Sequence, residues 1–191
     1  MSSIPPLNIS GLFSPDAAIR TASAAAIYNH GLALAKPVLS SWLSNGEISR
    51  LLWGQLVTVG VAVFPDTFAR IEQANSNPRL ASVPDEMDAK EFELQFATEM
   101  SLDILTTRDP EGEGAIARYL KRFGEGIQQV EFHCLDVDRA TAILRENFSF
   151  APIYPQARPG ADGTRVNFFL APTSAGGKVL IELYEIPGNQ S

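Results

Sequence analysis

The stretch Gly124-Glu125-Gly126-Ile127-Gln128-Gln129-Val130-Glu131-Phe132 carries the most information about the fold of this 191-residue chain. Its glycines favour a tight turn, because glycine adopts backbone conformations that other residues avoid. From Gln128 to Leu135, polar and apolar side chains alternate, which is the period of a strand with one face on a core. The stretch therefore predicts a turn followed by a half-buried strand over 128–135, with a helix over 136–147 after it.

The chain repeats this pattern once, at a distance of roughly 70 residues. Val57-Thr58-Val59-Gly60-Val61-Ala62-Val63 can be laid over Gln128-Gln129-Val130-Glu131-Phe132-His133-Cys134, and an acidic residue and a helical pattern follow each run. Further strands are predicted over 90–97 and 101–107 in the first half, and over 148–154, 164–170 and 179–184 in the second. A repeated unit of strand, helix and strands indicates an internal duplication. Neither unit buries its sheet face alone, so the two are expected to pair around a shared cavity.

These patterns divide the chain into four segments. Residues 1–50 are predicted to be an N-terminal helical extension, with one helix from Ser14 to Asn29, a stop at Gly31, and a second helix from Pro37 to Asn45. Residues 51–110 form the first module, 111–125 a linking helix, and 126–191 the second module. The apolar faces of the extension predict that it caps the cavity or adds to a dimer interface, and a homodimer is expected.

The overall composition excludes several classes of partner. The net charge of -7 argues against a nucleic acid, since neutralising phosphates requires clustered Lys and Arg. The chain lacks a stretch of about 18 apolar residues, so no membrane span is expected. Its N-terminus lacks the basic start and apolar centre of a secretion signal. A single cysteine, Cys134, suits a reducing compartment. A cytoplasmic protein is therefore expected.

Residues from about 55 to 188 resemble the vicinal-oxygen-chelate superfamily of glyoxalases, bleomycin-resistance proteins and dioxygenases. Within it, the likeness to methylmalonyl-CoA epimerases is the strongest. The likeness is carried by Gly124-Glu125-Gly126-Ile127, by Arg158-Pro159-Gly160-Ala161-Asp162-Gly163-Thr164-Arg165-Val166, and by Ala171-Pro172-Thr173-Ser174-Ala175-Gly176-Gly177-Lys178-Val179-Leu180-Ile181-Glu182-Leu183. It implies an α+β fold in which two paired βαβββ modules form a cup-shaped sheet, preceded here by the N-terminal helical extension.

The resemblance also implies a metal ion in the cup, held by side chains from the first and last strands of each module. Those positions hold Thr58, Gln129, Asp103 and Glu182 here, so both histidine positions are lost while Glu182 is retained. Amide oxygen is a weaker donor than imidazole for a borderline divalent ion. Asp103, Gln129 and Glu182 remain to hold a hard cation such as Mg²⁺ through water. No cofactor is therefore expected, and at most a weakly bound divalent cation.

The alternation of strand side chains predicts which other residues face the cup. With Thr58 pointing inward, the predicted cup residues are Gly60, Ala62, Glu91, Glu93, Gln95, Ser101, Asp103, Gln129, Glu131, His133, Arg165, Asn167, Phe169, Glu182 and Tyr184. A shift of one residue in the 90–97 strand would put Phe92 in the place of Glu93. Buried carboxylates are costly unless paired or protonated, so a group of them in a cavity indicates acid–base chemistry.

Other interpretations of individual residues stay open. Glu91 also fits a solvated strand end, and His133 also fits a hydrogen-bonded interior residue. Arg165 fits either an anion binder or a structural partner of Glu182 or Asp103. Tyr184 and Phe169 also fit plain walls of the cavity.

The resemblance and the acidic cup together predict an enzyme of isomerase, cyclase or lyase type that forms an enolate from a small or polyketide-like carbonyl compound. Glu182 is the expected base, with Asp103, Glu93 and His133 as further catalytic candidates. The expected substrate contacts are Gln129, Arg165, Thr58, Glu131, Asn167 and Tyr184.

One alternative is a methylmalonyl-CoA epimerase with an atypical metal site. A second is a binding protein that sequesters a ligand without turning it over. In the epimerases, a lysine after the proline of the loop before the last strand is positioned to meet the phosphates of coenzyme A. Here Thr173 stands at that place and Lys178 follows several residues later, which argues against binding of coenzyme A.

Overall fold

The computed structural model describes residues 7–174, 176–186 and 188, without the side chains of residues 53–56. Residues 1–6 of the predicted extension, and residues 175, 187 and 189–191 of the predicted second module, lie outside the described residues.

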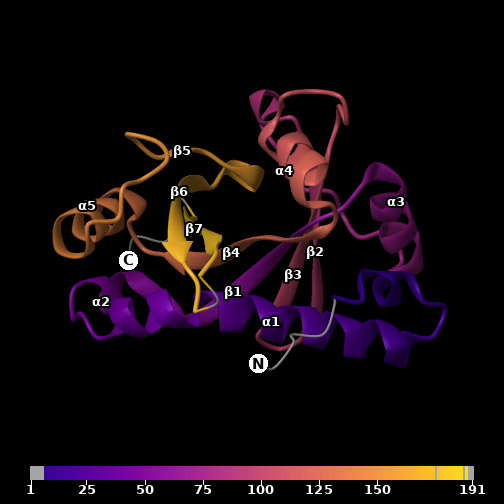
Figure 1. Ribbon diagram of the computed structural model, residues 1–191, viewed down its shortest axis with the longest axis horizontal. Coiled ribbons are helices and arrows are strands. Elements are labelled where there is room, and N and C mark those ends of the chain that lie inside the picture. Colours follow the sequence, from indigo (N-terminus) through magenta and orange to yellow (C-terminus); the bar gives the residue numbers. More distant parts are fainter. Residues whose placement is uncertain (1–6, 175, 187, 189–191) are drawn as a thin grey trace.

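The described residues form one curled, seven-stranded sheet in the order β2-β3-β1-β4-β7-β6-β5 (Figure 1). This is the α+β cup that the sequence predicts. In chain order the elements are η1 (Ile9–Phe13), α1 (Ala17–Leu43), α2 (Ile48–Leu51), β1 (Leu52–Ala62), α3 (Pro65–Ala74), η2 (Asp85–Met87), β2 (Ala89–Ala97), β3 (Met100–Thr107), α4 (Ala115–Phe123), β4 (Gly126–Cys134), α5 (Val137–Phe148), β5 (Arg158–Pro159), η3 (Ala161–Gly163), β6 (Arg165–Pro172) and β7 (Lys178–Glu185).

The strand register supports the internal duplication. β1 and β4, the first strands of the two halves, lie antiparallel at the centre of the sheet, with Gly60 opposite Gln129. The last strand of each half runs parallel to its own first strand. Asp103 of β3 pairs with Gly60, and Glu182 of β7 pairs with Glu131. Because the two halves place these residues in the same way, Asp103 is the counterpart of Glu182, as the sequence predicts.

In each half, the segment between the helix and the last two strands forms little or no strand. The strand predicted over 148–154 is wrong, since only an isolated bridge joins Pro152 to Phe169 and β5 spans just two residues. Proline has no N–H to donate, so Pro152 and Pro155 interrupt a ladder there. In the first half, residues 75–84 form no strand, although the N–H of Ala81 donates to the carbonyl of Glu91.

The N-terminal segment forms one long helix where two are predicted. α1 starts after Asp16, whose carboxylate accepts the N–H of Ala18, and runs to Leu43 with Pro37 inside it. The predicted stop at Gly31 is therefore wrong. Figure 1 shows α1 running beneath the sheet, where it contacts β1, β2, β3, β4, β6 and β7. Among the described helices, none has the length and apolar character needed to cross a membrane.

Two apolar clusters on the outer face of the sheet share this helix. Ile27 of α1 belongs to the cluster of the first half with Phe92, while Trp42 belongs to the cluster of the second half with Phe132. α3 and α5 complete the two clusters on the same face. The prediction that the extension caps the cup is therefore wrong, because the apolar side of α1 is used against the opposite face. The extension is part of the core of the fold.

Gly31 allows α1 to approach β1 closely. A Cβ at this position would lie 2.5 Å from Cγ2 of Val59. Alanine favours a helix by about 1 kcal/mol over glycine, but overpacking costs about 1–3 kcal/mol. We expect Gly31→Ala to lower the free energy of unfolding, measured by urea denaturation. The double variant with Val59→Ala should lose less than the sum of the two single losses, and a fully stable Gly31→Ala variant would contradict the close contact.

Candidate active site

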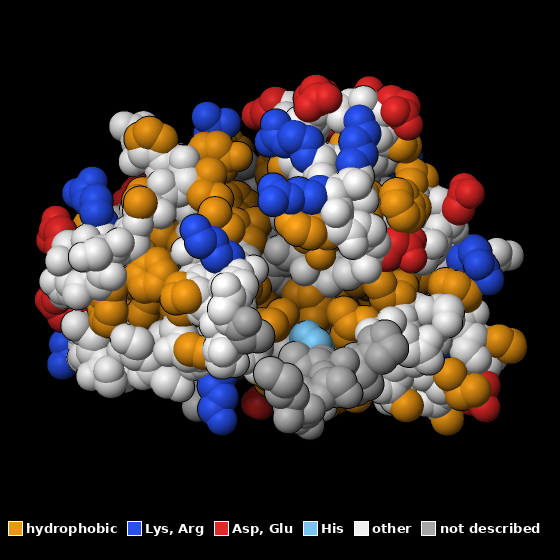
Figure 2. All heavy atoms as spheres, viewed as in Figure 1, with side chains coloured by type: hydrophobic (Ala, Val, Ile, Leu, Met, Phe, Trp, Pro, Cys, Tyr) orange, Lys and Arg blue, Asp and Glu red, His pale blue; other side chains and the backbone are white. Residues whose placement is uncertain are grey.

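A cavity of about 1010 Å³ opens on the inner face of the curled sheet. Strands β1, β2, β3, β4, β6 and β7 line its floor, and residues from the segments 79–87, 113–118 and 153–164 form its rim. Figure 2 shows a hollow between the half that carries α5 and the half that carries α4, with Lys and Arg side chains gathered over α4. Pockets for small molecules have volumes of about 300–1,000 Å³, so this cavity has room for one small organic ligand.

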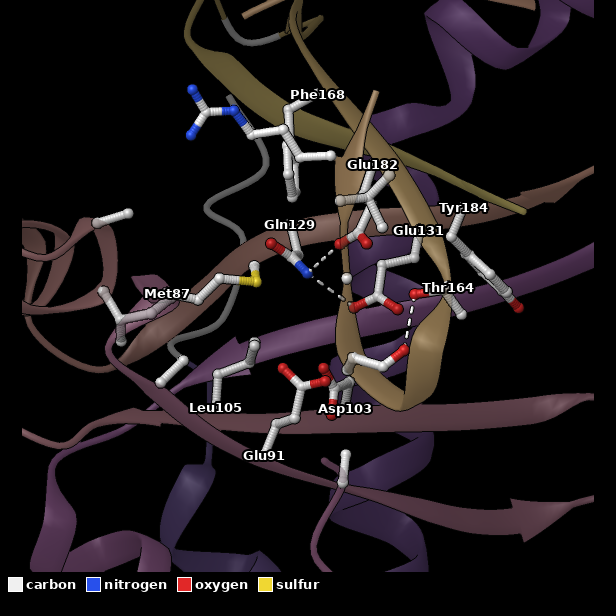
Figure 3. A pocket seen from close by; sticks show the side chains of 18 of the residues that line it. Met87, Glu91, Asp103, Leu105, Gln129, Glu131, Thr164, Phe168, Glu182 and Tyr184 are labelled. Carbon is white, nitrogen blue, oxygen red and sulfur yellow. Dashed lines mark hydrogen bonds between the residues drawn. The ribbon is translucent and has the colours of Figure 1, made fainter. Parts of the chain in front are cut away.

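Carboxylates from both halves line the floor of the cavity. Their residues are Glu91, Glu93, Asp103, Glu131 and Glu182. Phe92 is fully buried on the other face, so the register that puts Glu93 in the cup is right. A solvated strand end was the alternative interpretation of Glu91, but this residue is half-buried and lines the cavity. Figure 3 shows Glu91 and Asp103 facing Glu131 and Glu182. We call these carboxylates the acidic floor.

Gln129 joins two members of the acidic floor. Its Nε2 donates to Oε1 of Glu131 at 3.0 Å and to Oε2 of Glu182 at 2.6 Å (Figure 3). Gly60 makes room for this bridge, since a Cβ there would lie 2.5 Å from Cγ of Gln129 and 3.1 Å from Oε1 of Glu131. The Gln129 bridge therefore requires a glycine at position 60.

Burial and mutual repulsion raise the pKa of four carboxyl groups of the acidic floor, those of Glu91, Asp103, Glu131 and Glu182. Burial raises the pKa of Glu91 to about 7 and that of Glu131 to about 8. Burial also raises the pKa of Asp103 and Glu182 well above their usual range, and the neighbouring negative charges add to the effect. The hydrogen bond from Gln129 opposes the rise at Glu182. Near neutral pH the cavity thus contains both carboxylic acids and carboxylates, as acid–base catalysis requires.

These raised pKa values make stability depend on pH. A carboxyl group whose pKa is higher in the folded chain binds protons more tightly when folded, so its contribution is lost as pH rises through the folded pKa. For Glu91 and Glu131 the window runs from their ordinary 4.5 to about 7 and about 8. We expect the free energy of unfolding to fall across this window, by at most about 1.4 kcal/mol per pH unit for each group. Urea denaturation at a series of pH values measures this fall. Glu131→Gln should flatten the profile, whereas a wild-type profile that rises with pH would contradict it.

Thr58, Tyr184 and His133 lie on the same face as Gln129. Thr58 lines the cavity, is 9% exposed, and has no hydrogen-bond partner for its hydroxyl among the described residues. Tyr184 lines the cavity as well. His133 is buried and stacks on Tyr184, with ring centroids 5.1 Å apart, but it is not part of the cavity lining. Burial lowers the pKa of His133. His133 therefore supports Tyr184 from beside the cavity.

The predictions that Arg165 and Asn167 point into the cup are wrong. Arg165 forms ion pairs with Asp138 of α5 and with Glu185 of β7. Asn167 is fully buried on the α5 side, where its Nδ2 donates to the carbonyl of Tyr154. Arg165 is a structural partner, as the alternative interpretation held, but of different carboxylates from those foreseen.

β6 alternates in the opposite phase to the one predicted. Val166 and Phe168 line the cavity, opposite Tyr184 and Glu182 of β7. Phe169 belongs to the outer cluster of the second half. Both faces of β6 carry apolar residues, because the strand lies between the cavity and α5, so the pattern of polar and apolar residues does not set its phase.

Sequence reasoning missed the rim of the cavity. Arg79 donates to both carboxylate oxygens of Asp162, at 3.1 Å and 2.5 Å, and the N–H of Ser82 donates to Oδ1 of Asp162 at 2.9 Å. This contact joins the first half to the second across the cavity mouth. Arg118 and Arg158 also line the rim. The quoted turn around Asp162 was visible in the sequence, but irregular segments far apart in the chain carry no periodic signal for a contact.

The residues at the family's metal positions do not fit a divalent ion. Gln129 turns its Nε2 donor toward Glu182, where a ligand would have to present a lone pair. Thr58 offers a neutral hydroxyl in place of the second histidine. Within the described part of the chain, no group of three or more His, Cys, Asp or Glu side chains is placed to hold a metal ion. The family's metal chemistry therefore has no matching ligand set in the described residues.

Comparison with known proteins gives structural matches. No family model matches the chain, and no curated protein does so either. Methylmalonyl-CoA epimerase from Mycobacterium tuberculosis is 29% identical, with a TM-score of 0.54, covering 72% of this chain and 94% of that one. A hypothetical protein from Bacillus halodurans C-125 is 24% identical, with a TM-score of 0.57, covering 72% of this chain and 97% of that one. A methylmalonyl-CoA epimerase in complex with methylmalonyl-CoA and NH4+ is 22% identical, with a TM-score of 0.57, covering 74% of this chain and 99% of that one.

These solved structures are similar to this chain in overall fold. The matches span nearly the whole of the matched proteins and leave part of this chain without a counterpart. The chain has the vicinal-oxygen-chelate fold, and its structural neighbours are methylmalonyl-CoA epimerases.

Proposed function

We propose that the chain is an enzyme that removes a proton from the carbon beside a carbonyl group, with carboxylates on facing walls of the cavity as base and acid. The observation that carries the proposal is the Gln129 bridge, which holds Glu131 and Glu182 in a cavity whose opposite wall carries Glu91 and Asp103. Such an arrangement serves proton transfer better than it serves stability, because buried carboxylates weaken a fold.

Glu182 is the proposed base. The hydrogen bond from Gln129, at 2.6 Å to Oε2, orients the carboxyl group and favours its ionised form. Burial raises the pKa of Glu182, so its carboxylate is a stronger base than a solvated glutamate. In the proposed step the C–H bond breaks, the proton moves to Glu182, and the electron pair moves onto the carbonyl oxygen to form an enolate.

Glu91 and Asp103 are the proposed acids on the opposite wall. Their raised pKa values keep a proton available near neutral pH. A neutral carboxylic acid donates a hydrogen bond to a developing enolate oxygen, and it also returns a proton to carbon from the other side. Isomerase-type chemistry follows from two facing groups that exchange these roles, and the epimerase neighbours support that class.

Hydrogen–deuterium exchange tests the proposal. The protein is incubated in deuterated water with hydroxyacetone, aminoacetone, pyruvate and the propionyl thioester of N-acetylcysteamine, and NMR follows the hydrogens beside each carbonyl. We expect exchange above the buffer rate for at least one compound. The unfolded protein at the same concentration is the control, and buffer-rate exchange for every compound would overturn the proposal.

A second candidate is a methylmalonyl-CoA epimerase, favoured by the 29% identity to the Mycobacterium tuberculosis enzyme over 72% of the chain. The acidic floor disfavours it, because the substrate of that reaction carries a free carboxylate. Incubation with methylmalonyl-CoA in deuterated water separates the two candidates. Fast exchange at that substrate alone would favour the epimerase over the broader proposal.

A further inference from the structure

The cavity has a marked separation of charge. The acidic floor comes from β2, β3, β4 and β7, while the basic residues of the lining, Arg79, Arg118 and Arg158, come from the rim. Arg79 is held by Asp162, and the Arg158 guanidinium lies 4.1 Å from the ring centroid of Tyr154. Among the described lining residues, no Lys or Arg rises from the strands that carry the carboxylates. The carboxyl groups of the floor therefore have no basic partner among the described lining residues of their own strands.

The hydrogen bonds of the floor leave an excess of acceptors. Gln129 supplies its Nε2 to Glu131 and Glu182, and Ser101 donates to Oε1 of Glu93 at 3.0 Å. Within the described chain, the side chains of Glu91 and Asp103 accept no hydrogen bond. An occupant that supplies hydrogen-bond donors fits the ionised carboxylates of this floor better than one that supplies acceptors.

Thr58 points to an occupant of the cavity independently of the carboxylates, because its hydroxyl can accept a hydrogen bond from a ligand donor. It is nine-tenths buried, it lines the cavity, and its strand neighbours across the sheet are Ser101 and Glu131. Its hydroxyl makes no hydrogen bond with any described residue. The Thr58 hydroxyl therefore remains available for a hydrogen bond to a ligand atom that lies beside Thr58 and Glu131.

We propose that the reacting end of the substrate carries a positively charged nitrogen, bound by the acidic floor and the Thr58 hydroxyl, so that the substrate class is an amino carbonyl compound. This inference deepens the proposed function and rests on it for the carbonyl group. A protonated amine supplies three donors and a full charge at once. A metal ion is the other cationic occupant, but the described residues offer no ligand set for one.

Binding of such a cation has a consequence that a neutral ligand lacks. A positive charge beside Glu131 favours the ionised form of its carboxyl group and lowers its pKa. Glu131 then releases its proton as the ligand binds. Proton release on binding is therefore a signature of the charged nitrogen and is measured by calorimetry in buffers with different heats of ionisation.

Three ligands of nearly equal size test the inference: aminoacetone, hydroxyacetone and pyruvate, which place an ammonium, a hydroxyl and a carboxylate beside the same ketone. Titration calorimetry of the full chain near pH 7.5 should give at least about tenfold tighter binding for aminoacetone than for hydroxyacetone, and the weakest binding for pyruvate. Aminoacetone alone should release protons. Equal affinities, or tighter binding of pyruvate, would overturn the inference.

Variants test whether Glu131 and Thr58 bind the charged nitrogen. Glu131→Gln and Thr58→Val preserve shape, and each should weaken aminoacetone by about tenfold while leaving hydroxyacetone within about twofold. Glu146→Gln, on the exposed part of α5, changes the net charge in the same way as Glu131→Gln and should leave both affinities unchanged. Thermal unfolding confirms that each variant is folded, and Thr58→Val alone decides the outcome should Glu131→Gln unfold. Loss of affinity in Glu146→Gln equal to that in Glu131→Gln would overturn the inference.

Exchange in deuterated water with the same ligands separates this inference from the proposed function. Aminoacetone that binds with proton release but exchanges no hydrogen would support the charged nitrogen and remove the acid–base role. Exchange that is fastest on pyruvate would support the acid–base role and overturn the charged nitrogen.

Discussion

Glu182→Gln is expected to slow the exchange of hydrogens beside the substrate carbonyl by about 10²–10⁴-fold, the usual contribution of a general base. Glutamine has the shape of glutamate but cannot accept the proton. The Gln129 bridge survives in part, because Nε2 of Gln129 still donates to the amide oxygen that replaces Oε2 of Glu182. The measurement is the NMR exchange rate at saturating ligand, compared with the wild-type rate.

Two further variants control this result. Glu146→Gln makes the same change of residue at an exposed site of α5 and should retain the wild-type rate. Gln129→Leu removes the bridge but leaves the Glu182 carboxylate, so it should reduce the rate less than Glu182→Gln does. Exchange that is undiminished in Glu182→Gln would exclude Glu182 as the base.

Trp42→Ala is expected to lower the free energy of unfolding by about 3–5 kcal/mol. Trp42 is fully buried and packs edge-on against Phe132, Phe150 and Phe169, with ring centroids 6.4, 5.7 and 6.4 Å away. It lies at the C-terminal end of α1, so its loss opens a cavity between the helix and the second half of the sheet. Urea denaturation measures the change.

Trp42→Phe is the matched control. It keeps an aromatic ring in the cluster, and the indole nitrogen has no hydrogen-bond partner among the described residues, so the smaller change should cost less than Trp42→Ala. α1 also supplies Ile27 to the first cluster. Removal of residues 1–46 should therefore unfold the protein, beyond any change of oligomeric state. A stable, soluble truncation would contradict the assignment of α1 to the core.

The sheet and most of the acidic floor were predictable from the sequence. Period-two alternation sets the phase of β2 because Phe92 faces the core while Glu91 and Glu93 face away, and only one phase buries the aromatic residue. The resemblance to the vicinal-oxygen-chelate superfamily placed Asp103 and Glu182 at the ends of the two modules before any register was known. Local periodicity and duplication are enough to predict which side chains face the cavity where one face of a strand is clearly apolar.

Other features depend on packing that local patterns do not encode. Gly31 reads as a helix stop, but it is a point of close approach between α1 and Val59. Arg165 and Asn167 read as cup residues because both faces of β6 are covered, one by the cavity and one by α5. The Arg79–Asp162 pair joins a loop of the first half to the short helix η3 of the second half. Each of these is decided by a partner far away in the sequence.

The fold and the metal chemistry of the family are separable in this chain. The strands hold the same positions, but an amide donor at Gln129 and a hydroxyl at Thr58 stand where the family places ligands for a cation. A fold supplies a cavity, and the side chains that line it decide the chemistry. The proton transfer between carboxylates that we propose rests on those side chains.

The most direct test of this account is the exchange of hydrogen beside a ketone in deuterated water, measured by NMR before and after prolonged treatment of the protein with a metal chelator. The account predicts that exchange occurs with aminoacetone, that its rate is unchanged by chelation, and that it is lost in Glu182→Gln. Exchange that disappears on chelation and returns with an added divalent ion would contradict the claim that the carboxylates act without a bound metal.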